Sequence, residues 1–239
     1  MTVRPPSRTS RPDTVGSLSV SARRLTAGAG RGDVAGDLHG ALDTPFGTRL
    51  LIGDVMGKGR EGARTAAAVL QTWTRLAPRE RSLEALAVRL HSVVVHSAEP
   101  DRFVTAALLT IAPDGGADLV CCGHPPPLLI RDGGAVPAAV PAPAPPLGLL
   151  DLAHGWCAAQ PVPARSWERM LLHTDGVTEA RDADGVFYPL AERAAELAGR
   201  PLAVFTAALA ADLLHHARGN LQDDASLLAV EAAPALMRA

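Results

Sequence analysis

The sequence is poor in cysteine and in aromatic residues. Its three cysteines, Cys121, Cys122 and Cys157, include no CxxC pair, and their number is odd. This count fits neither a disulfide framework nor a cysteine zinc site, so we expect buried thiols in a reducing, cytoplasmic environment. Aromatic residues make up only 3% of the chain and hydrophobic residues 47%, so the core must consist mainly of Ala, Leu and Val.

Neither sign of charge dominates, and long hydrophobic runs are absent. Lys and Arg number 23 and Asp and Glu number 25, which gives a formal net charge of -2. That balance provides no basic surface for nucleic acid or for an anionic membrane. No stretch reaches the ~18 apolar residues of a membrane span, and no apolar signal segment follows the basic N-terminus. We therefore expect no nucleic acid and no membrane among its partners.

Apolar periodicity divides the chain into strands and paired helices. Strands are predicted within residues 16–27, 48–59, 102–113, 116–123, 126–133, 168–177 and 223–233. Helices are predicted within 60–77, 82–98, 189–199 and 201–217, and the Pro/Ala-rich segment 136–148 is predicted to be an extended surface loop. The order does not alternate β-α-β, which favours a layered architecture with antiparallel sheets. We expect residues 1–15 to form a flexible arm and residues 16–239 to form one domain.

Aspartates recur where the predicted strands begin or end. Asp37 lies in VAGDL, Asp54 in LLIGDVMGKG, Asp175 in MLLHTDGV, and Asp223 with Asp224 in LQDDASLLAV. One such Asp more often just caps a turn, but several at one sheet edge would repel each other unless cations lay among them. Oxygen donors without His or Cys select Mg²⁺ or Mn²⁺, and two such ions would activate water for attack on phosphorus.

Seven segments form an ordered set that runs from about Asp33 to Val230. They are GDVAGDLHGAL, RLLIGDVMGKGREGARTAAAVL, RFVTAALLTI, CCGHPPPLLI, PPLGLL, LLHTDGVTEARDADG and DDASLLAV. In this order they resemble the motifs of bacterial PPM-type (type 2C) protein serine/threonine phosphatases of the SpoIIE-like branch. The resemblance implies an α+β fold, a four-layer α/β/β/α sandwich in which two antiparallel β-sheets are flanked by helical pairs. It also implies two Mn²⁺ or Mg²⁺ ions at one edge of that sandwich.

The resemblance assigns roles to individual residues. Four side chains match the acidic metal ligands and catalytic groups of the family, namely Asp37, Asp54, Asp175 and Asp223. Asp54 matches the bridging ligand, with the Val55 backbone carbonyl beside it. Asp224 stands where relatives carry Asp or Asn, and it completes the set of metal ligands that we predict.

The chain departs from the family motifs at several positions. His39 and Gly40 replace an aromatic residue and a second Asp, and Lys58 stands where relatives often have His. We expect Lys58 to reach solvent, with a role in holding phosphate as the alternative. His124, which precedes three prolines, is expected to be a turn histidine fixed by hydrogen bonds rather than a metal ligand. Because the four acidic positions are intact, we expect an active enzyme.

The function that the resemblance implies is hydrolysis of phosphoserine or phosphothreonine on a protein. In this branch the usual substrate is a phosphorylated anti-anti-sigma factor, which places the chain in a partner-switching circuit. Only about 30 residues precede the first motif. We therefore expect regulation by a partner chain, by assembly into a homodimer, by metal availability or by expression level.

Two other functions stay open. One is a phosphatase-like scaffold that has lost catalysis, and the other is a two-metal hydrolase of a small phosphoester. Serine-triad hydrolysis and P-loop nucleotide chemistry lack support, because the sequence contains neither a GxSxG elbow nor a Walker A loop.

Overall fold

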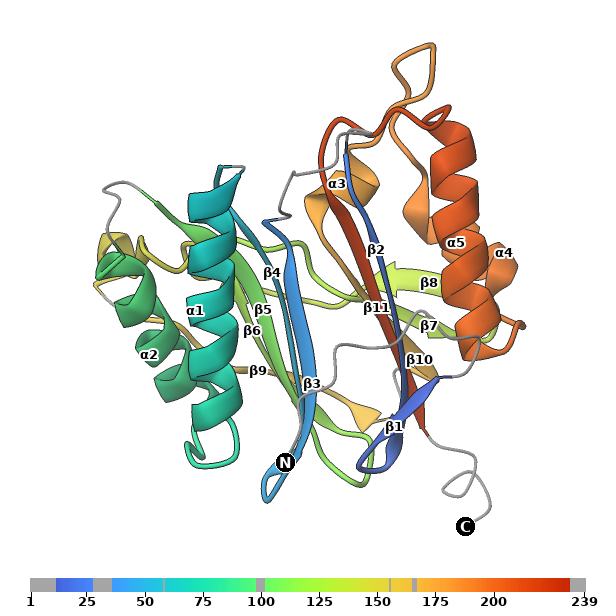
Figure 1. Ribbon diagram of the computed structural model, residues 1–239. Coiled ribbons are helices and arrows are strands. Elements are labelled where there is room, and N and C mark those ends of the chain that lie inside the picture. The colour runs from blue at the N-terminus through green and yellow to red at the C-terminus, as the bar shows by residue number, and fades with distance from the viewer. Residues whose placement is uncertain are drawn as a thin grey trace.

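A computed structural model describes residues 12–27, 36–57, 59–97, 102–154, 156–164 and 167–232. Two antiparallel sheets face each other, and a pair of helices covers the outer face of each sheet (Figure 1). One outer layer consists of α1 (Arg60–Leu76) and α2 (Leu83–Val95), and the other of α4 (Leu190–Leu197) and α5 (Leu202–His216). The predicted α+β sandwich with four layers is confirmed.

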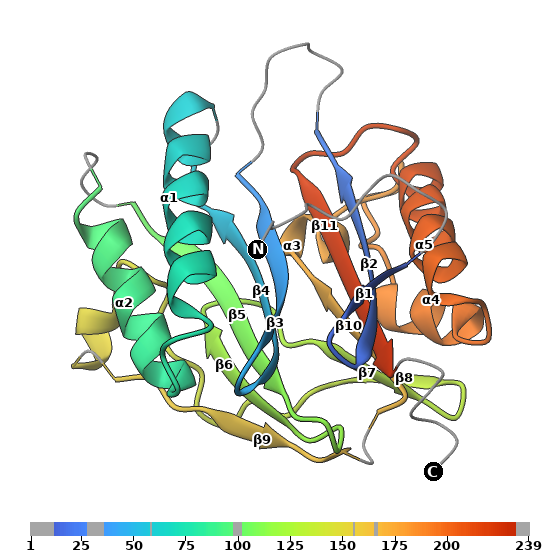
Figure 2. The ribbon, with the colours of Figure 1, turned by 60° about the horizontal axis from the view of Figure 1, so that its bottom comes forward.

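The two sheets are continuous antiparallel ladders, and Figure 2 shows them from a second side. The six-stranded sheet has the order β1-β2-β11-β10-β7-β8, and its strands are β1 (Asp13–Val15), β2 (Leu18–Leu25), β7 (Leu128–Arg131), β8 (Gly134–Pro137), β10 (Arg169–His173) and β11 (Ala225–Ala232). The five-stranded sheet has the order β3-β4-β5-β6-β9, formed by β3 (Leu38–Thr44), β4 (Gly47–Val55), β5 (Val104–Ile111), β6 (Ala117–Cys122) and β9 (Gln160–Val162). Two short helical segments, α3 (Asp175–Thr178) and η1 (Leu150–Ala153), complete the described elements.

Three hydrophobic cores separate the four layers. Successive side chains of a strand point to opposite faces, so each sheet contributes to two cores. On β5, Leu108 belongs to the core under α1 and α2, whereas Leu109 belongs to the core between the sheets. Phe205 of α5 is fully buried in the third core. Burying one such side chain contributes roughly 1.5–3 kcal/mol, so the layers are held mainly by hydrophobic packing.

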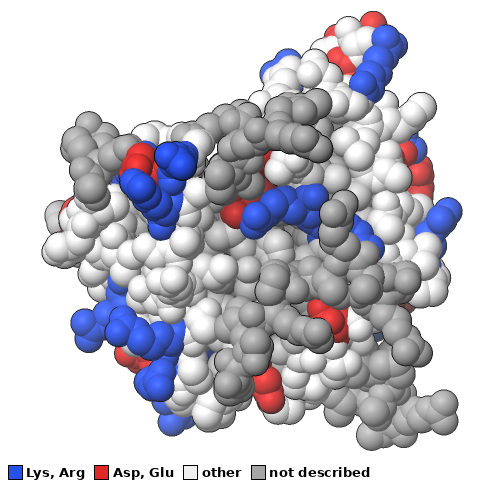
Figure 3. Space-filling view, in the orientation of Figure 1, with Lys and Arg blue, Asp and Glu red and all other residues white. Residues whose placement is uncertain are grey.

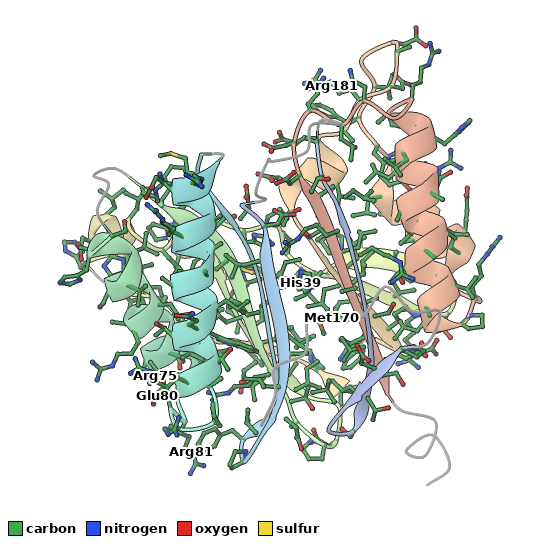
Figure 4. The ribbon with its side chains drawn as sticks, viewed as in Figure 1. His39, Arg75, Glu80, Arg81, Met170 and Arg181 are labelled. Carbon is green, nitrogen blue, oxygen red and sulfur yellow. The ribbon has the colours of Figure 1, made fainter. Side chains whose placement is uncertain are left out.

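The helices begin and end close to where the sequence places them. The side chain of Ser82 caps α2 by accepting a hydrogen bond of 3.0 Å from the Ala85 backbone N–H. At the same end of the helix pair, Arg49 is only 1% exposed, and its guanidinium donates to the carbonyls of Ala77, Glu80 and Arg81. Glu80 and Arg81 lie at the lower end of α1 in Figure 4. A buried arginine of the sheet therefore fixes the connection between the two helices.

Several strands were not predicted. β3 lies in a glycine-rich segment, and it forms because it pairs with β4 along its whole length, from Leu38 opposite Gly53 to Thr44 opposite Gly47. β1 pairs with β2, so residues 13–15 of the expected flexible arm are part of a hairpin. Residues 1–11 of that arm lie outside the described residues.

The Pro/Ala-rich segment is more buried than predicted. Ala138 and Ala144 are buried, and Leu147 is fully buried and exchanges two backbone hydrogen bonds with Val104 of β5. The segment therefore lies along the sandwich with exposed residues on one side and a few buried anchors on the other.

Charged side chains on the face in Figure 3 form small groups of both signs on a largely uncharged surface. This distribution agrees with the balanced composition of the chain. Within the described residues, none of the helices is both long enough and apolar enough to cross a membrane.

Candidate metal and active site

Four strand ends meet at one end of the sandwich. β3 begins one residue after Asp37, β4 carries Asp54 near its end, β10 ends two residues before Asp175, and β11 begins one residue after Asp224. In Figure 1 these ends lie at the top of the two sheets. A cavity of about 270 Å³ opens there, and its lining comes from both sheets: Gly36, Asp54, Val55, Met56, Gly57, Phe103, Thr105, Asp175, Asp223 and Asp224.

The structure brings the predicted site residues together. Five of the six line this cavity directly: Asp54, Val55, Asp175, Asp223 and Asp224. The sixth, Asp37, is only 3% exposed and lies within hydrogen-bonding range of the Asp54 carboxyl. The carboxylates therefore occupy one region of the molecule, as the sequence predicted, although they come from positions far apart in the chain.

Asp37 is fixed by groups from three other strand ends. The Thr174 hydroxyl donates to Asp37 Oδ2 at 3.2 Å, and the same hydroxyl accepts from the Ser226 N–H at 2.9 Å. A guanidinium nitrogen of Arg24 donates to the Asp37 backbone carbonyl at 2.5 Å. Burial raises the pKa of Asp37 to about 6, while the Ser226 hydroxyl and the charge of Arg24 act in the opposite direction. These groups hold the Asp37 carboxyl in place, while burial disfavours its charged form.

The pKa of Asp54 is raised further than that of Asp37. Burial raises the pKa of the Asp54 carboxyl to about 8, and the negative charges of Asp37, Asp175 and Asp223 contribute further. Mutual repulsion of this kind means that the cluster disfavours its own full ionisation at neutral pH. A cation among the carboxylates would remove that penalty.

Two glycines beside the acidic residues are required by close packing. A Cβ on Gly176 would lie 1.9 Å from the Asp224 backbone oxygen, so α3 can approach the start of β11 only without a side chain there. A Cβ on Gly36 would lie 3.1 Å from both Asp54 Oδ1 and the Val55 carbonyl oxygen. The Asp-Gly and Gly-Asp pairs of the sequence therefore keep backbone and carboxylates close together.

The turn before β11 is tied to the end of β2. The Asp224 Oδ1 atom accepts from the Ala27 backbone N–H at 3.0 Å, and the Asp224 N–H donates to Asp223 Oδ1 at 2.9 Å. One oxygen of each carboxylate is thus engaged with backbone. This arrangement fixes the direction in which both side chains face the cavity.

Some functional candidates were missed in the sequence, and others lie elsewhere. Thr105 lines the cavity and Thr174 holds Asp37. Each is a hydroxyl residue at one end of a mainly apolar strand segment, and this position is the signal that could have indicated them. His39 does not line the cavity; it lies between the sheets, beside Met170 in the view of Figure 4, and burial lowers its pKa to about 4. Lys58 lies outside the described residues.

The donor chemistry of the cavity fits a hard divalent cation. All of the candidate donors are oxygens, from carboxylates and from the Val55 carbonyl. In the part of the chain that the structure describes, no three His, Cys, Asp or Glu side chains form a group that could by itself hold an ion. Mg²⁺ usually binds through one or two carboxylates and keeps several waters, and the cavity has room for them. The residues present therefore fit a hydrated ion.

Comparison with known proteins decides the family. A family model described as Stage II sporulation protein E (SpoIIE) matches residues 44–233, which is most of the chain. The chain belongs to the SpoIIE family. The predicted SpoIIE-like branch is thereby confirmed, and the chain shares the fold of PPM-type serine/threonine phosphatases. None of the curated proteins matches the sequence.

Solved structures share the fold of this SpoIIE-family chain at low sequence identity. The RsbU and RsbW domains of a Mycobacterium tuberculosis protein align with a TM-score of 0.74 and 23% identity, over 94% of this chain and 63% of that one. The chain thus spans less than two thirds of that protein. RsbX in complex with magnesium aligns with a TM-score of 0.67 and 13% identity, over 93% of this chain and 99% of RsbX. The serine/threonine phosphatase PstP/Ppp of Mycobacterium tuberculosis aligns with a TM-score of 0.62 and 18% identity, over 90% and 98%.

Proposed function

We propose that this SpoIIE-family chain hydrolyses phosphoserine or phosphothreonine on a protein with the help of two Mn²⁺ or Mg²⁺ ions. The ions would be held by Asp37, Asp54, Asp175 and Asp223, together with the Val55 carbonyl and Asp224. The observation that carries this proposal is the cavity at the meeting point of four strand ends, in which burial, together with the neighbouring carboxylate charges, raises the pKa of Asp54 to about 8. Such a cluster is stabilised by cations and destabilised without them.

The residues of the chain would position the ions and leave the cavity open to a phosphoryl group. When bound, the ions would polarise a water for attack on phosphorus and offset the charge of the phosphate. Asp37 and Thr174 are buried and hold the floor of the site, while Met56 is 41% exposed at its rim. Gly36 and Gly57 line the cavity without side chains that would block the approach of a phosphoryl group. A rigid floor with an open rim suits a phosphorylated side chain on the surface of another protein.

The substrate that we favour is a phosphorylated anti-anti-sigma factor in a partner-switching circuit. Support comes from the family and from the fold shared with a protein that carries RsbU and RsbW domains. A regulatory partner chain or a second copy of this chain would control access to the cavity.

The proposal is tested by phosphate release from a phosphoserine protein or peptide with added Mn²⁺, before and after EDTA. We expect turnover that depends on Mn²⁺ and that EDTA abolishes. Asp54→Asn should reduce turnover by ~10²- to 10³-fold, because removal of a group central to transition-state stabilisation costs about that much. Turnover that survives chelation would contradict the two-metal site. Mn²⁺ binding without turnover would indicate a scaffold, and preference for a small phosphoester over a phosphopeptide would indicate a metabolite hydrolase.

A further inference from the structure

Thr105 lies directly behind the backbone of Asp54. The two residues are paired across β4 and β5, and the Thr105 hydroxyl oxygen lies 3.5 Å from the Asp54 carbonyl oxygen. Thr105 also lines the cavity itself. Its hydroxyl is therefore the polar group of β5 that is best placed to fix the end of β4.

The same hydroxyl contacts a buried histidine. Nδ1 of His124 lies 3.1 Å from Thr105 Oγ1, and the His124 residue is only 6% exposed. Among the described residues, Nε2 of this ring has no hydrogen-bond partner. Burial lowers the pKa of His124 to about 3, so the ring is neutral at physiological pH. A buried polar ring with one nitrogen unpartnered costs stability, by ~1–3 kcal/mol, and a well-packed apolar side chain would avoid that cost.

His124 also connects the two sheets. It follows β6 of one sheet and lies near His173 at the end of β10 in the other, whose charge also lowers the pKa of His124. Nδ1 of His173 lies 3.1 Å from the Thr174 carbonyl oxygen. Thr174 in turn donates to Asp37 and directly precedes Asp175. Buried polar groups thus lie along the path from the Asp54 edge of the site to the Asp175 edge, with His124 near His173 between the two contact pairs.

The turn that places His124 is sterically fixed. Gly123 has φ +62°, and a Cβ there would lie 2.5 Å from the Pro146 side chain. The Gly123 N–H also donates to the Ala144 carbonyl at 2.8 Å. This turn therefore has little freedom to move, and it fixes the position of the His124 imidazole between the sheets.

We propose that Thr105 and His124 are positioning residues that hold the Asp54 edge of the cavity in register with the Asp175 edge, so that ions can bind across the two sheets. This inference rests on the proposed metal-dependent function. It assigns neither residue a direct contact with the ions. Both act through the backbone of Asp54 and through the end of β10.

The chain offers matched variants for a test. Thr105→Val keeps the shape of the side chain and removes the hydroxyl, and Thr105→Ser restores the hydroxyl. Thr110→Val is the control, because Thr110 lies on the same strand and its hydroxyl has no partner in the described part of the chain. His124→Phe removes the imidazole that contacts the Thr105 hydroxyl. Circular dichroism and thermal unfolding show which variants fold.

The first readout is Mn²⁺ affinity by calorimetry on the folded variants. We expect Thr105→Val to weaken Mn²⁺ binding by about 10- to 100-fold, as the loss of groups that orient metal ligands usually does. Thr105→Ser should recover most of the affinity, and Thr110→Val should match the unaltered chain. The double variant Thr105→Val/His124→Phe should bind no more weakly than the weaker single variant, because both changes break the same series of contacts. Equal Mn²⁺ affinity of Thr105→Val and Thr110→Val would overturn the proposal.

The second readout needs no metal. Hydrogen exchange of the segment that contains residues 50–57 should be faster in Thr105→Val than in Thr110→Val, since the end of β4 loses a side-chain contact that supports its backbone pairing with β5. If the unaltered chain binds no Mn²⁺, the proposed function fails, and hydrogen exchange still shows whether the pair fixes β4. Unchanged exchange in Thr105→Val would overturn the positioning role on its own.

Discussion

At the scale of single residues, Asp54 determines the behaviour of the site. Its carboxyl is partly buried, lies beside Asp37 and interacts with the charges of Asp175 and Asp223. The folded chain therefore binds a proton at Asp54 more tightly than the unfolded chain does, because the ordinary pKa is 3.8 and the folded value is about 8. Unfolding releases this proton between those two pH values, so the contribution of Asp54 to stability falls as pH rises through that window.

The decrease in the contribution of Asp54 to stability with rising pH predicts how the melting temperature depends on pH. Without divalent cations, the melting temperature of the chain should fall between pH 7.0 and 8.5, and Asp54→Asn should make this part of the profile flatter. The range above pH 6.5 is chosen because burial lowers the pKa of three histidines, His39, His124 and His173, and their effect on stability appears below it. Thermal unfolding of both proteins in a chelator checks the prediction. An identical slope in the two proteins would contradict it.

A variant of Asp175 tests whether activity can be lost without a loss of stability. Asp175→Ala removes one of several mutually repelling carboxylates, so we expect turnover to be abolished while the melting temperature without metal stays equal or rises. Asp184→Ala, in an exposed turn beyond α3, is the matched control and should leave turnover unchanged. Phosphate release and thermal unfolding are measured side by side. A strongly destabilised Asp175→Ala would show that this residue has a structural role instead.

The sequence predicted the acidic residues and missed the groups that hold them. Asp37, Asp54, Asp175 and Asp223 were identifiable because each stands at the end of an apolar run within a recognisable motif. The hydroxyl of Thr174 could not be assigned to Asp37, since the two residues are 137 positions apart and only the fold joins them. That these acidic residues bind metal stays a prediction.

At the scale of elements, α3 and the start of β11 are fitted to each other through Gly176. Gly176→Ala would place a methyl group within 1.9 Å of the Asp224 backbone oxygen, so the backbone must move. We expect a loss of stability of ~1–3 kcal/mol and weaker Mn²⁺ binding, because Asp175 and Asp224 would separate. Gly199→Ala is the control, since nothing lies within 4 Å of its added Cβ. Chemical denaturation and calorimetry test both variants, and equal behaviour would refute the close fit.

The buried Arg49 is expected to fix the helical pair α1 and α2. Arg49→Leu would leave the Ala77, Glu80 and Arg81 carbonyls without their donor, at a cost of ~1–3 kcal/mol for each buried acceptor that water cannot reach. Arg75→Leu, at an exposed position near the end of α1, is the control and should have little effect. Urea unfolding measures the difference. A neutral Arg49→Leu would show that these carbonyls find other partners.

Elements with a strong apolar pattern were predictable, and elements that depend on partners were not. The expected segments for α1, α5, β5 and β11 contain the observed ones, because each buries a long apolar face. The short strands β1, β8 and β9 have three or four residues each and form through pairing with a neighbour. Local sequence carries little information about such strands.

At the scale of the whole molecule, the four layers place four strand ends at one edge. The layer order followed from the resemblance to the SpoIIE-like branch and not from periodicity, because apolar patterns do not say which sheet a strand joins. The family match and the shared fold now support that order. The position of the cavity between the sheets makes the site sensitive to anything that shifts one sheet against the other.

The most direct test of this account is a calorimetric titration of the chain with Mn²⁺, in parallel with Asp54→Asn. The account predicts two ions bound per chain at neutral pH, with proton release on binding, and a large loss of affinity in the variant. No measurable binding by the unaltered chain, or equal binding by both proteins, would contradict it.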